Sequence, residues 1–162
     1  MVGGKTRLAK DFRDLLRVFV AYDVRFLVVG AYALAVLGRP RATGDLDVWV
    51  DATPNNAPRT LAALREFGAP LHELSLDDLS RPSVVYQIGL PPLRIDILTA
   101  IDGVEFSVAW PRRITADFDG VEVPVIGRDD FLVNKRATGR LKDRADAERL
   151  DPRRPNSRPR RR

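Results

Sequence analysis

Two aspartates, Asp45 and Asp47, lie two residues apart in a run of strand-type residues that ends at Val50. Side chains alternate faces along a strand, so both carboxylates point the same way, with Cα atoms roughly 6.6 Å apart. Neighbouring carboxylates on a buried strand repel each other and cost stability unless a cation joins them. Carboxylate oxygens are hard ligands that favour Mg²⁺ or Mn²⁺. This pair therefore predicts a divalent metal site.

The segment before this strand predicts a phosphate site. An apolar run of strand type, residues 26–29, ends at Gly30, and a short helix-forming run, residues 31–37, follows it. The free N–H groups at the start of a helix favour phosphate oxygens. A phosphate cradle followed by a metal-binding carboxylate pair is the equipment for phosphoryl or nucleotidyl transfer.

A third carboxylate, Asp96, lies between two isoleucines in a later run of strand type, LRIDILT. An aspartate on such a strand needs a partner, and a metal shared with Asp45 and Asp47 supplies one. The alternative is that these carboxylates form salt bridges with nearby arginines. The candidates are Arg39, Arg41 and Arg94.

The order of these features resembles the DNA polymerase β-type nucleotidyltransferase superfamily. The order is a strand, a glycine turn, a helix, Asp-x-Asp on the next strand, and an aspartate on a later strand. The stretch NKRATGRLKDRADAERL resembles the C-terminal helical motif of stand-alone bacterial nucleotidyltransferases related to AbiEii-like toxins. The resemblance covers roughly residues 26–150. The family usually has Gly-Gly or Gly-Ser at the turn. Here Gly30-Ala31 keeps the backbone N–H but lacks the serine hydroxyl.

The resemblance implies a metal-dependent enzyme that transfers an NMP from an NTP to an acceptor hydroxyl. The implied catalytic residues are Asp45, Asp47, Asp96 and Asp146, the first three also as ligands of Mg²⁺ or Mn²⁺. The implied nucleotide-binding residues are Gly30, Ala31, Thr43 and Lys135. The acceptor could be a tRNA end, a protein side chain or a small molecule. A macromolecular acceptor is favoured, in a toxin–antitoxin or phage-defence setting with an antitoxin as partner. The alternative class is a catalytically inactive nucleotide- or partner-binding module, such as an antitoxin-like component.

Several of these residues have structural alternatives. Lys135 could instead solvate a helix surface, and Asp143 and Asp146, three apart on one helical face, could form an exposed helix pair. The residues before the metal strand could contact phosphates or pair with carboxylates; they are Arg39, Arg41 and Thr43. The single histidine, His72, is expected to be an exposed loop residue rather than a general base.

The alternation of apolar runs and turn residues predicts an α/β fold. We expect a small mixed, twisted sheet with helices packed on one side and a helical C-terminal segment closing the site. The GGKT at residues 3–6 is expected to be a helix entry, and Asp129 or Asp130 a helix cap. Helices are predicted at residues 5–22, 31–37, 54–67, 102–110, 129–137 and 142–150. Strands are predicted at residues 26–29, 45–50, 84–88, 93–98, 113–116 and 121–126.

Length and composition set the wider limits. A chain of 162 residues with 44% hydrophobic residues is expected to form one globular domain, residues 1–150, followed by a disordered basic tail, residues 151–162. The chain has no cysteine, which excludes disulfides and thiolate chemistry and fits a reducing cytoplasm. No apolar run approaches the length of a membrane span, and the start of the chain lacks the apolar core of a signal peptide. We therefore expect a cytoplasmic protein without a membrane partner.

The tail carries the net charge of the chain. It holds six arginines and one aspartate, and the whole chain has a net charge of +5, so residues 1–150 are neutral overall. Truncation after Leu150 is expected to leave the melting temperature and NTP affinity nearly unchanged. It should also remove most non-specific RNA affinity, because counterion release scales with the number of phosphates neutralised. Titration of RNA at several salt concentrations measures this change.

A truncated chain that still binds RNA with a steep salt dependence would contradict this prediction. The basic surface would then lie in the folded body, and an RNA acceptor would become the leading hypothesis. The members of that surface would be Arg39, Arg41, Arg112, Arg113, Lys135 and Arg136.

Overall fold

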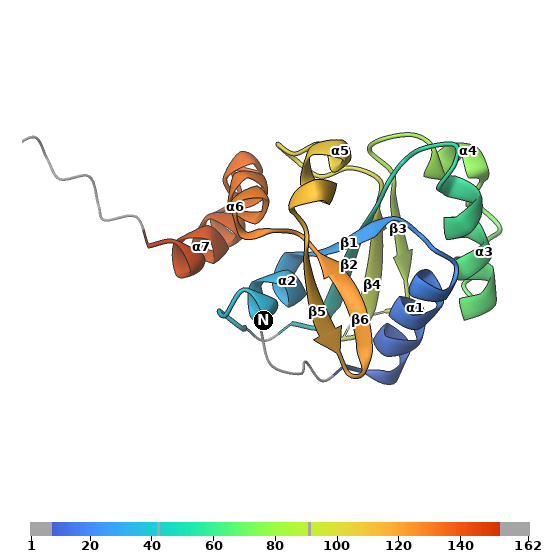
Figure 1. Ribbon diagram of the computed structural model, residues 1–162, viewed down its shortest axis with the longest axis horizontal. Helices are drawn as coiled ribbons and strands as arrows, with labels where there is room; N and C mark the ends of the chain where they lie inside the picture. The colour runs from blue at the N-terminus through green and yellow to red at the C-terminus, as the bar shows by residue number, and fades with distance from the viewer. Residues whose placement is uncertain (1–7, 42, 91, 153–162) are drawn as a thin grey trace, which may run out of the picture.

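The structure is a computed structural model that describes residues 8–41, 43–90 and 92–152 (Figure 1). The GGKT segment and the basic tail beyond Pro152 lie outside these residues. The strands are β1 (Phe26–Val29), β2 (Asp45–Val50), β3 (Val85–Ile88), β4 (Arg94–Leu98), β5 (Ile114–Phe118) and β6 (Val121–Val125). The helices are α1 (Lys10–Ala21), α2 (Gly30–Val36), α3 (Ala57–Phe67), α4 (Leu76–Leu79), α5 (Phe106–Ala109), the 3₁₀ helix η1 (Trp110–Arg112), α6 (Arg128–Ala137) and α7 (Leu141–Leu150).

The strands form a mixed sheet with the order β3-β4-β2-β1-β6-β5. Strand β2 pairs antiparallel with β1 and parallel with β4, and β1 pairs parallel with β6. All four residues of β1 are buried, which explains its continuous apolar sequence at the centre of the sheet. The predicted α/β class with a small mixed sheet is confirmed.

Helices cover both sides of this sheet. Figure 1 shows α1, α3 and α4 on one side, and α2, α6 and α7 on the other. The apolar stripe of α1 packs into the first layer; its buried residues are Phe12, Leu15, Leu16 and Phe19. We expected helices on one side of the sheet, with only the C-terminal helical segment elsewhere. The structure differs in α2, which lies on the same side as the C-terminal helices. None of the described helices has the length and apolar character that a membrane crossing requires.

Several helices begin later than the sequence pattern predicted. Helix α1 begins at Lys10 rather than at residue 5, and α3 at Ala57 rather than at residue 54. Before α3, the backbone N–H groups of Asn56 and Ala57 bond to the carbonyl of Thr53 as a separate turn. The predicted helix over residues 102–110 is reduced to α5, which continues as η1.

One helix was not predicted, and one predicted helix cap is wrong. Helix α4 is absent from the sequence prediction; Ser75 and Asp78 form a capping box at its start. Helix α6 begins after Gly127, without a side-chain cap, so neither Asp129 nor Asp130 has the predicted role. Asp130 is instead buried in the first turn and pairs with Arg112 at 3.3 Å.

Candidate active site

The pairing of β2 with β4 places the three predicted carboxylates on one face of the sheet. Asp47 lies opposite Asp96, and Asp45 lies opposite Arg94. The residues between them on β2, Leu46 and Val48, are fully buried on the other face. Because side chains alternate along both strands, Asp96 points to the same face as Asp45 and Asp47, as predicted.

Arg94 contacts two of these carboxylates. Its Nη2 donates to Oδ2 of Asp96 at 3.2 Å and to Oδ2 of Asp45 at 3.4 Å. Its Nε lies 2.9 Å from Oδ1 of Asp96. The pKa of Arg94 is raised, first by the hydrogen bond to Asp96. The arginine salt bridges considered from the sequence are therefore present, with Arg94 as the partner.

The glycine turn before α2 is shaped by Asp47. Gly30 has φ of +67°, and a Cβ built on it would lie inside van der Waals contact of the Asp47 carboxylate, 3.0 Å from its Cγ. A side chain at this position would both strain the backbone and displace the carboxylate. Ala31 is buried in the first turn of α2 beside it. The glycine therefore leaves room for a side chain from the neighbouring strand.

Thr43 stabilises the start of β2. Its Oγ1 accepts a hydrogen bond from the backbone N–H of Asp45 at 3.1 Å. The hydroxyl thus fixes the entry of the chain into the carboxylate strand. Its predicted contact with a nucleotide remains a prediction.

Helices α6 and α7 bring a second set of charges to the same region. Lys135 on α6 is 8% exposed, and its Nζ lies 3.1 Å from Oδ1 of Asp143 and 3.8 Å from Oδ2 of Asp146, both on α7. Asp146 is 2% exposed. Lys135 therefore does not lie on an exposed helix surface, and Asp143 and Asp146 do not form an exposed pair. The three side chains form one buried ion cluster.

This cluster is tied to the loop that precedes β2. Arg41 binds Asp146 through two nitrogens, with Nε 2.9 Å from Oδ1 and Nη2 3.2 Å from Oδ2. Arg39 donates to the backbone carbonyl of Arg149 at 3.0 Å, and Arg149 donates to the carbonyl of Pro40 at 3.0 Å. The two arginines considered as phosphate ligands or carboxylate partners thus hold the loop against α7.

Thr138 is a member of this cluster that sequence reasoning missed. Its Oγ1 donates to Oδ2 of Asp143 at 2.8 Å. Burial raises the pKa of Asp143, but the Thr138 hydroxyl and the Lys135 charge outweigh burial, and the pKa is lowered overall. Asp143 is therefore an ionised partner for Lys135. Its position five residues after Thr138, across the break at Gly139, has no helical periodicity that would have shown the contact.

Lys135 also acts on the carboxylates of the sheet. The pKa of Asp47 is raised to about 6, mainly by burial and then by the neighbouring charge of Asp96, while the charge of Lys135 acts to lower it. Asp47 is thus the point where the strand carboxylates and the helical ion cluster meet. Lys135 is close enough to act on Asp47, and Asp146 contacts Lys135, although both are far from the strand aspartates in the sequence.

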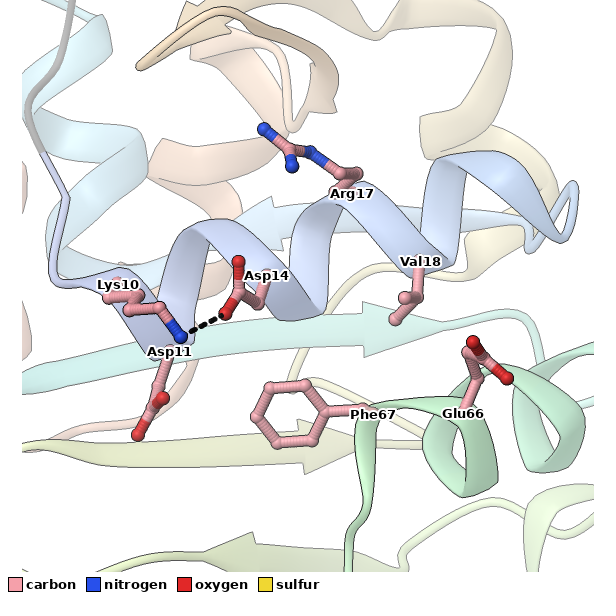
Figure 2. Close-up of a pocket in the computed structure, with 7 residues that line it drawn as sticks. All are labelled: Lys10, Asp11, Asp14, Arg17, Val18, Glu66 and Phe67. Atoms are coloured by element: carbon pink, nitrogen blue, oxygen red, sulfur yellow. Dashed lines mark ion pairs between the residues drawn. The ribbon is translucent and has the colours of Figure 1, made fainter.

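The remaining candidates lie elsewhere. His72 is exposed, as expected for a loop residue. A cavity of about 500 Å³ lies between α1 and α3 (Figure 2), in the helix layer on the other side of the sheet from α6 and α7. Figure 2 shows the ion pair between Lys10 and Asp14 at one end of this cavity, with Phe67 at its wall. The cavity is therefore separate from the carboxylate face.

Solved structures of similar fold include LnuA, a lincosamide antibiotic adenylyltransferase in its lincomycin-bound form. It matches with a TM-score of 0.56 at 14% identity, over 90% of this chain and 98% of that chain. TM1012 of Thermotoga maritima, assigned as a nucleotidyltransferase, matches with a TM-score of 0.57 at 16% identity, over 86% and 87%. An antigenic nucleotidyltransferase-like protein of Paracoccidioides brasiliensis matches with 0.51 at 15% identity, over 88% and 75%. The chain has the nucleotidyltransferase fold.

The comparisons by sequence give no further relationship. No family model matches the chain, and no curated protein matches it. The superfamily fold expected from the sequence resemblance is confirmed, and the narrower relationship to AbiEii-like toxins stays a prediction.

The nucleotidyltransferase resemblance implies a divalent cation, and the carboxylate face fits one. Oδ1 of Asp96, a residue that is 8% exposed, accepts no hydrogen bond from the described residues; its close neighbour is the charged Nε of Arg94, at 2.9 Å. The carboxylate of Asp47 lies in the space that the missing Cβ of Gly30 leaves. Within the described chain, no three His, Cys, Asp or Glu side chains already converge as a metal site. The hard oxygen donors are present, but Arg94 lies between two of them.

The raised pKa of Asp47 predicts how pH changes the stability of the metal-free protein. The folded protein holds the Asp47 proton up to about pH 6, whereas the unfolded chain releases it near 3.8. Stability is therefore expected to fall as pH rises through this window, by at most roughly 3 kcal/mol from this residue. Thermal denaturation in EDTA measures this change. Between about pH 5 and pH 7, the melting temperature of Asp47→Asn should fall by less than that of the wild type. Asp11→Asn, on an exposed residue, is the control; an equal loss in Asp47→Asn would contradict the assignment.

The Gly30 turn gives a second prediction. Gly30→Ala forces a Cβ against the Asp47 carboxylate and keeps an unfavourable φ, so we expect a destabilisation of about 1–3 kcal/mol. Gly120→Ala is the matched control, since Gly120 also has positive φ but open space around its Cβ position. Urea denaturation of both variants separates the steric term from the backbone term. Equal destabilisation of Gly30→Ala and Gly120→Ala would show that the Asp47 carboxylate makes no steric contact with a side chain at position 30.

Proposed function

We propose that the protein is a metal-dependent nucleotidyltransferase that transfers an NMP from an NTP to an acceptor hydroxyl. The observation that carries this proposal is the assembly of Asp45, Asp47 and Asp96 on one face of neighbouring strands, with Lys135 acting on Asp47. The nucleotidyltransferase fold supports it. The spatial assembly carries more weight than the fold alone, because one fold serves many functions.

The proposal gives each group of side chains a part in binding or proton transfer. Asp45 and Asp47 would hold the metal on the nucleotide side, and Asp96 would share the second metal with them on the acceptor side. The turn at Gly30 and Ala31, with Thr43, would receive the triphosphate. Lys135 would contact the β- and γ-phosphates as a point charge, for which a lysine suffices. Asp146 would keep Lys135 beside Asp47.

The bonds and protons balance within these groups. The acceptor oxygen bonds to the α-phosphorus, the bond from the α-phosphorus to the bridging oxygen breaks, and pyrophosphate leaves. The hydroxyl proton would pass to the carboxylate of Asp96, which this proposal assigns to the acceptor side. Bound divalent metal supplies charge neutralisation at the phosphates and lowers the pKa of the attacking hydroxyl. The charge of Lys135 would act on the leaving pyrophosphate.

The acceptor class is a further part of the proposal. A macromolecular hydroxyl, in a tRNA end or a protein side chain, follows from the toxin-type resemblance in the sequence. Each of the six basic residues considered for an RNA-binding surface has a partner within the protein, as with Arg136, which pairs with Asp151 at 3.0 Å. Arg39, Arg112 and Arg113 are nevertheless exposed, so an RNA acceptor stays a candidate beside a protein side chain. The lincomycin-bound neighbour, an antibiotic adenylyltransferase, makes a small-molecule hydroxyl the other class to test.

A specific observation favours a second candidate function, an inactive nucleotide- or partner-binding module. Arg94 already neutralises Asp45 and Asp96, and no ready-made metal site exists among the described residues. A protein that had lost catalysis could keep these ion pairs as structure. Thermal shift with Mn²⁺ and NTP separates the two candidates. Metal-dependent stabilisation by NTP that is lost in the double variant Asp45→Asn, Asp47→Asn supports the enzyme, whereas metal-independent stabilisation supports the module.

The activity itself is tested by label transfer. The protein is incubated with each α-labelled NTP, Mg²⁺ or Mn²⁺, and a bacterial lysate divided into RNA, protein and small molecules. Label in one fraction identifies the acceptor class, and the Asp45→Asn, Asp47→Asn double variant should lose it. Label transfer that persists in the double variant would exclude these carboxylates as the catalytic metal site.

The role of Lys135 gives a third prediction from the structure. Lys135→Met keeps the apolar stem but removes the charge, so NTP affinity should fall by about 1–2 kcal/mol, the range for a charge-assisted hydrogen bond. Lys142→Met, an exposed lysine on α7, is the matched control for loss of one charge. Isothermal titration with MgATP measures both. Unchanged affinity in a folded Lys135→Met variant would leave Lys135 only its structural part beside Asp143.

A further inference from the structure

The charges around the carboxylate face do not balance among themselves. Five carboxylates belong to the connected cluster: Asp45, Asp47, Asp96, Asp143 and Asp146. Within the part of the chain that the structure describes, three partly or fully buried cations face them: Arg41, Lys135 and Arg94. If all are ionised, two negative charges are left over, which is the charge of one divalent cation. Arg140 contacts Asp143 only from the exposed rim, at 3.7 Å.

The three cations are held differently. Arg41 grips Asp146 with two nitrogens, and Lys135 is enclosed between α6 and α7. Arg94 instead spans two carboxylates from the strand surface, with its side chain 29% exposed and its Nη2 contacts at 3.2 and 3.4 Å. Its Nε and Oδ1 of Asp96 lie 2.9 Å apart but lack hydrogen-bond geometry. Arg94 is therefore the most exposed of the three cations, with side-chain exposures of 19% for Arg41 and 10% for Lys135.

We propose that Arg94 is a positioning residue that takes the place of a metal ion between Asp45 and Asp96, and that it leaves when a divalent cation binds there. This proposal rests on the metal site of the proposed function. The guanidinium and a divalent cation would use the same carboxylate oxygens, so they compete. Arg94 can move into solvent when it is released, because its side chain is already partly exposed, and the bound cation would replace its charge between the carboxylates.

The competition gives Arg94 a function in the order of binding. While Arg94 spans Asp45 and Asp96, free metal meets a positive charge at the site. A metal ion that arrives bound to a triphosphate is part of a complex with net negative charge, so the complex is not repelled by Arg94. Metal binding therefore depends on nucleotide in the wild type, and Arg94 is the side chain that imposes this dependence.

The test is the affinity of the protein for Mn²⁺ alone, measured by isothermal titration and by Mn²⁺ electron paramagnetic resonance. Arg94→Gln removes the competing charge, so we expect its affinity for Mn²⁺ to be at least about tenfold higher than that of the wild type. The gain in Mn²⁺ affinity on adding a non-hydrolysable NTP analogue should shrink in the variant. Equal or weaker Mn²⁺ binding in folded Arg94→Gln overturns the proposal.

Two further variants keep the result unambiguous. Arg81→Gln removes an exposed arginine that also pairs with two aspartates, Asp77 and Asp78, and should not change Mn²⁺ affinity. Arg94→Lys keeps the charge but cannot span both carboxylates, so its Mn²⁺ affinity should lie between those of the wild type and Arg94→Gln. If Arg94→Gln does not fold, Arg94→Lys decides, and an affinity no higher than that of the wild type overturns the proposal.

A separate variant distinguishes failure of this inference from failure of the proposed function. Asp47→Asn should abolish Mn²⁺ binding if the metal site is on the carboxylate face. Loss of binding in Asp47→Asn together with an unchanged affinity in the Arg94 variants keeps the metal site and rejects the role of Arg94. Equal Mn²⁺ binding in Asp47→Asn and the wild type rejects the metal site itself, and the inference with it.

Discussion

The structure depends on the compensation of negative charge at the junction of β2 and β4. The parallel register sets Asp47 beside Asp96, and the buried residues on the other face of both strands prevent a shift of that register. Carboxylates in this position repel one another and are poorly hydrated. Both effects raise the pKa of Asp47, through its burial and through the charge of Asp96. Every charged element nearby serves this constraint.

The C-terminal helices meet the constraint from outside the sheet. Lys135 and Arg41 each neutralise an aspartate of α7, and in doing so they tie α6, α7 and the loop before β2 into one unit. Buried ion pairs of this kind are weak contributors to stability but costly to break, because one partner is then left buried and unpaired. The cluster therefore fixes the position of α7 more than it strengthens the fold.

The same contacts explain why the region suits phosphate chemistry. A lysine enclosed by two aspartates and close to a third is held in place before any ligand arrives. Gly30 lets the backbone approach the Asp47 carboxylate, which a larger residue would push away. Prearranged charges need little reorganisation when new charge enters the site. This arrangement is compatible with a stable domain because the opposite face of β2 and β4 is apolar and buried.

The sequence by itself determined the strands, the shared face of the three aspartates and the nucleotidyltransferase type of fold. Those features follow from local periodicity: Asp45 and Asp47 alternate with buried residues, and Asp96 stands between isoleucines. Helix starts such as that of α6 were less well predicted, because Asp130 is drawn into a pair with Arg112 instead of capping the helix. The tertiary structure alone decided which arginine meets which carboxylate. Arg41 and Asp146 are 105 residues apart, and no local pattern records a contact that exists only because α7 packs beside the loop before β2.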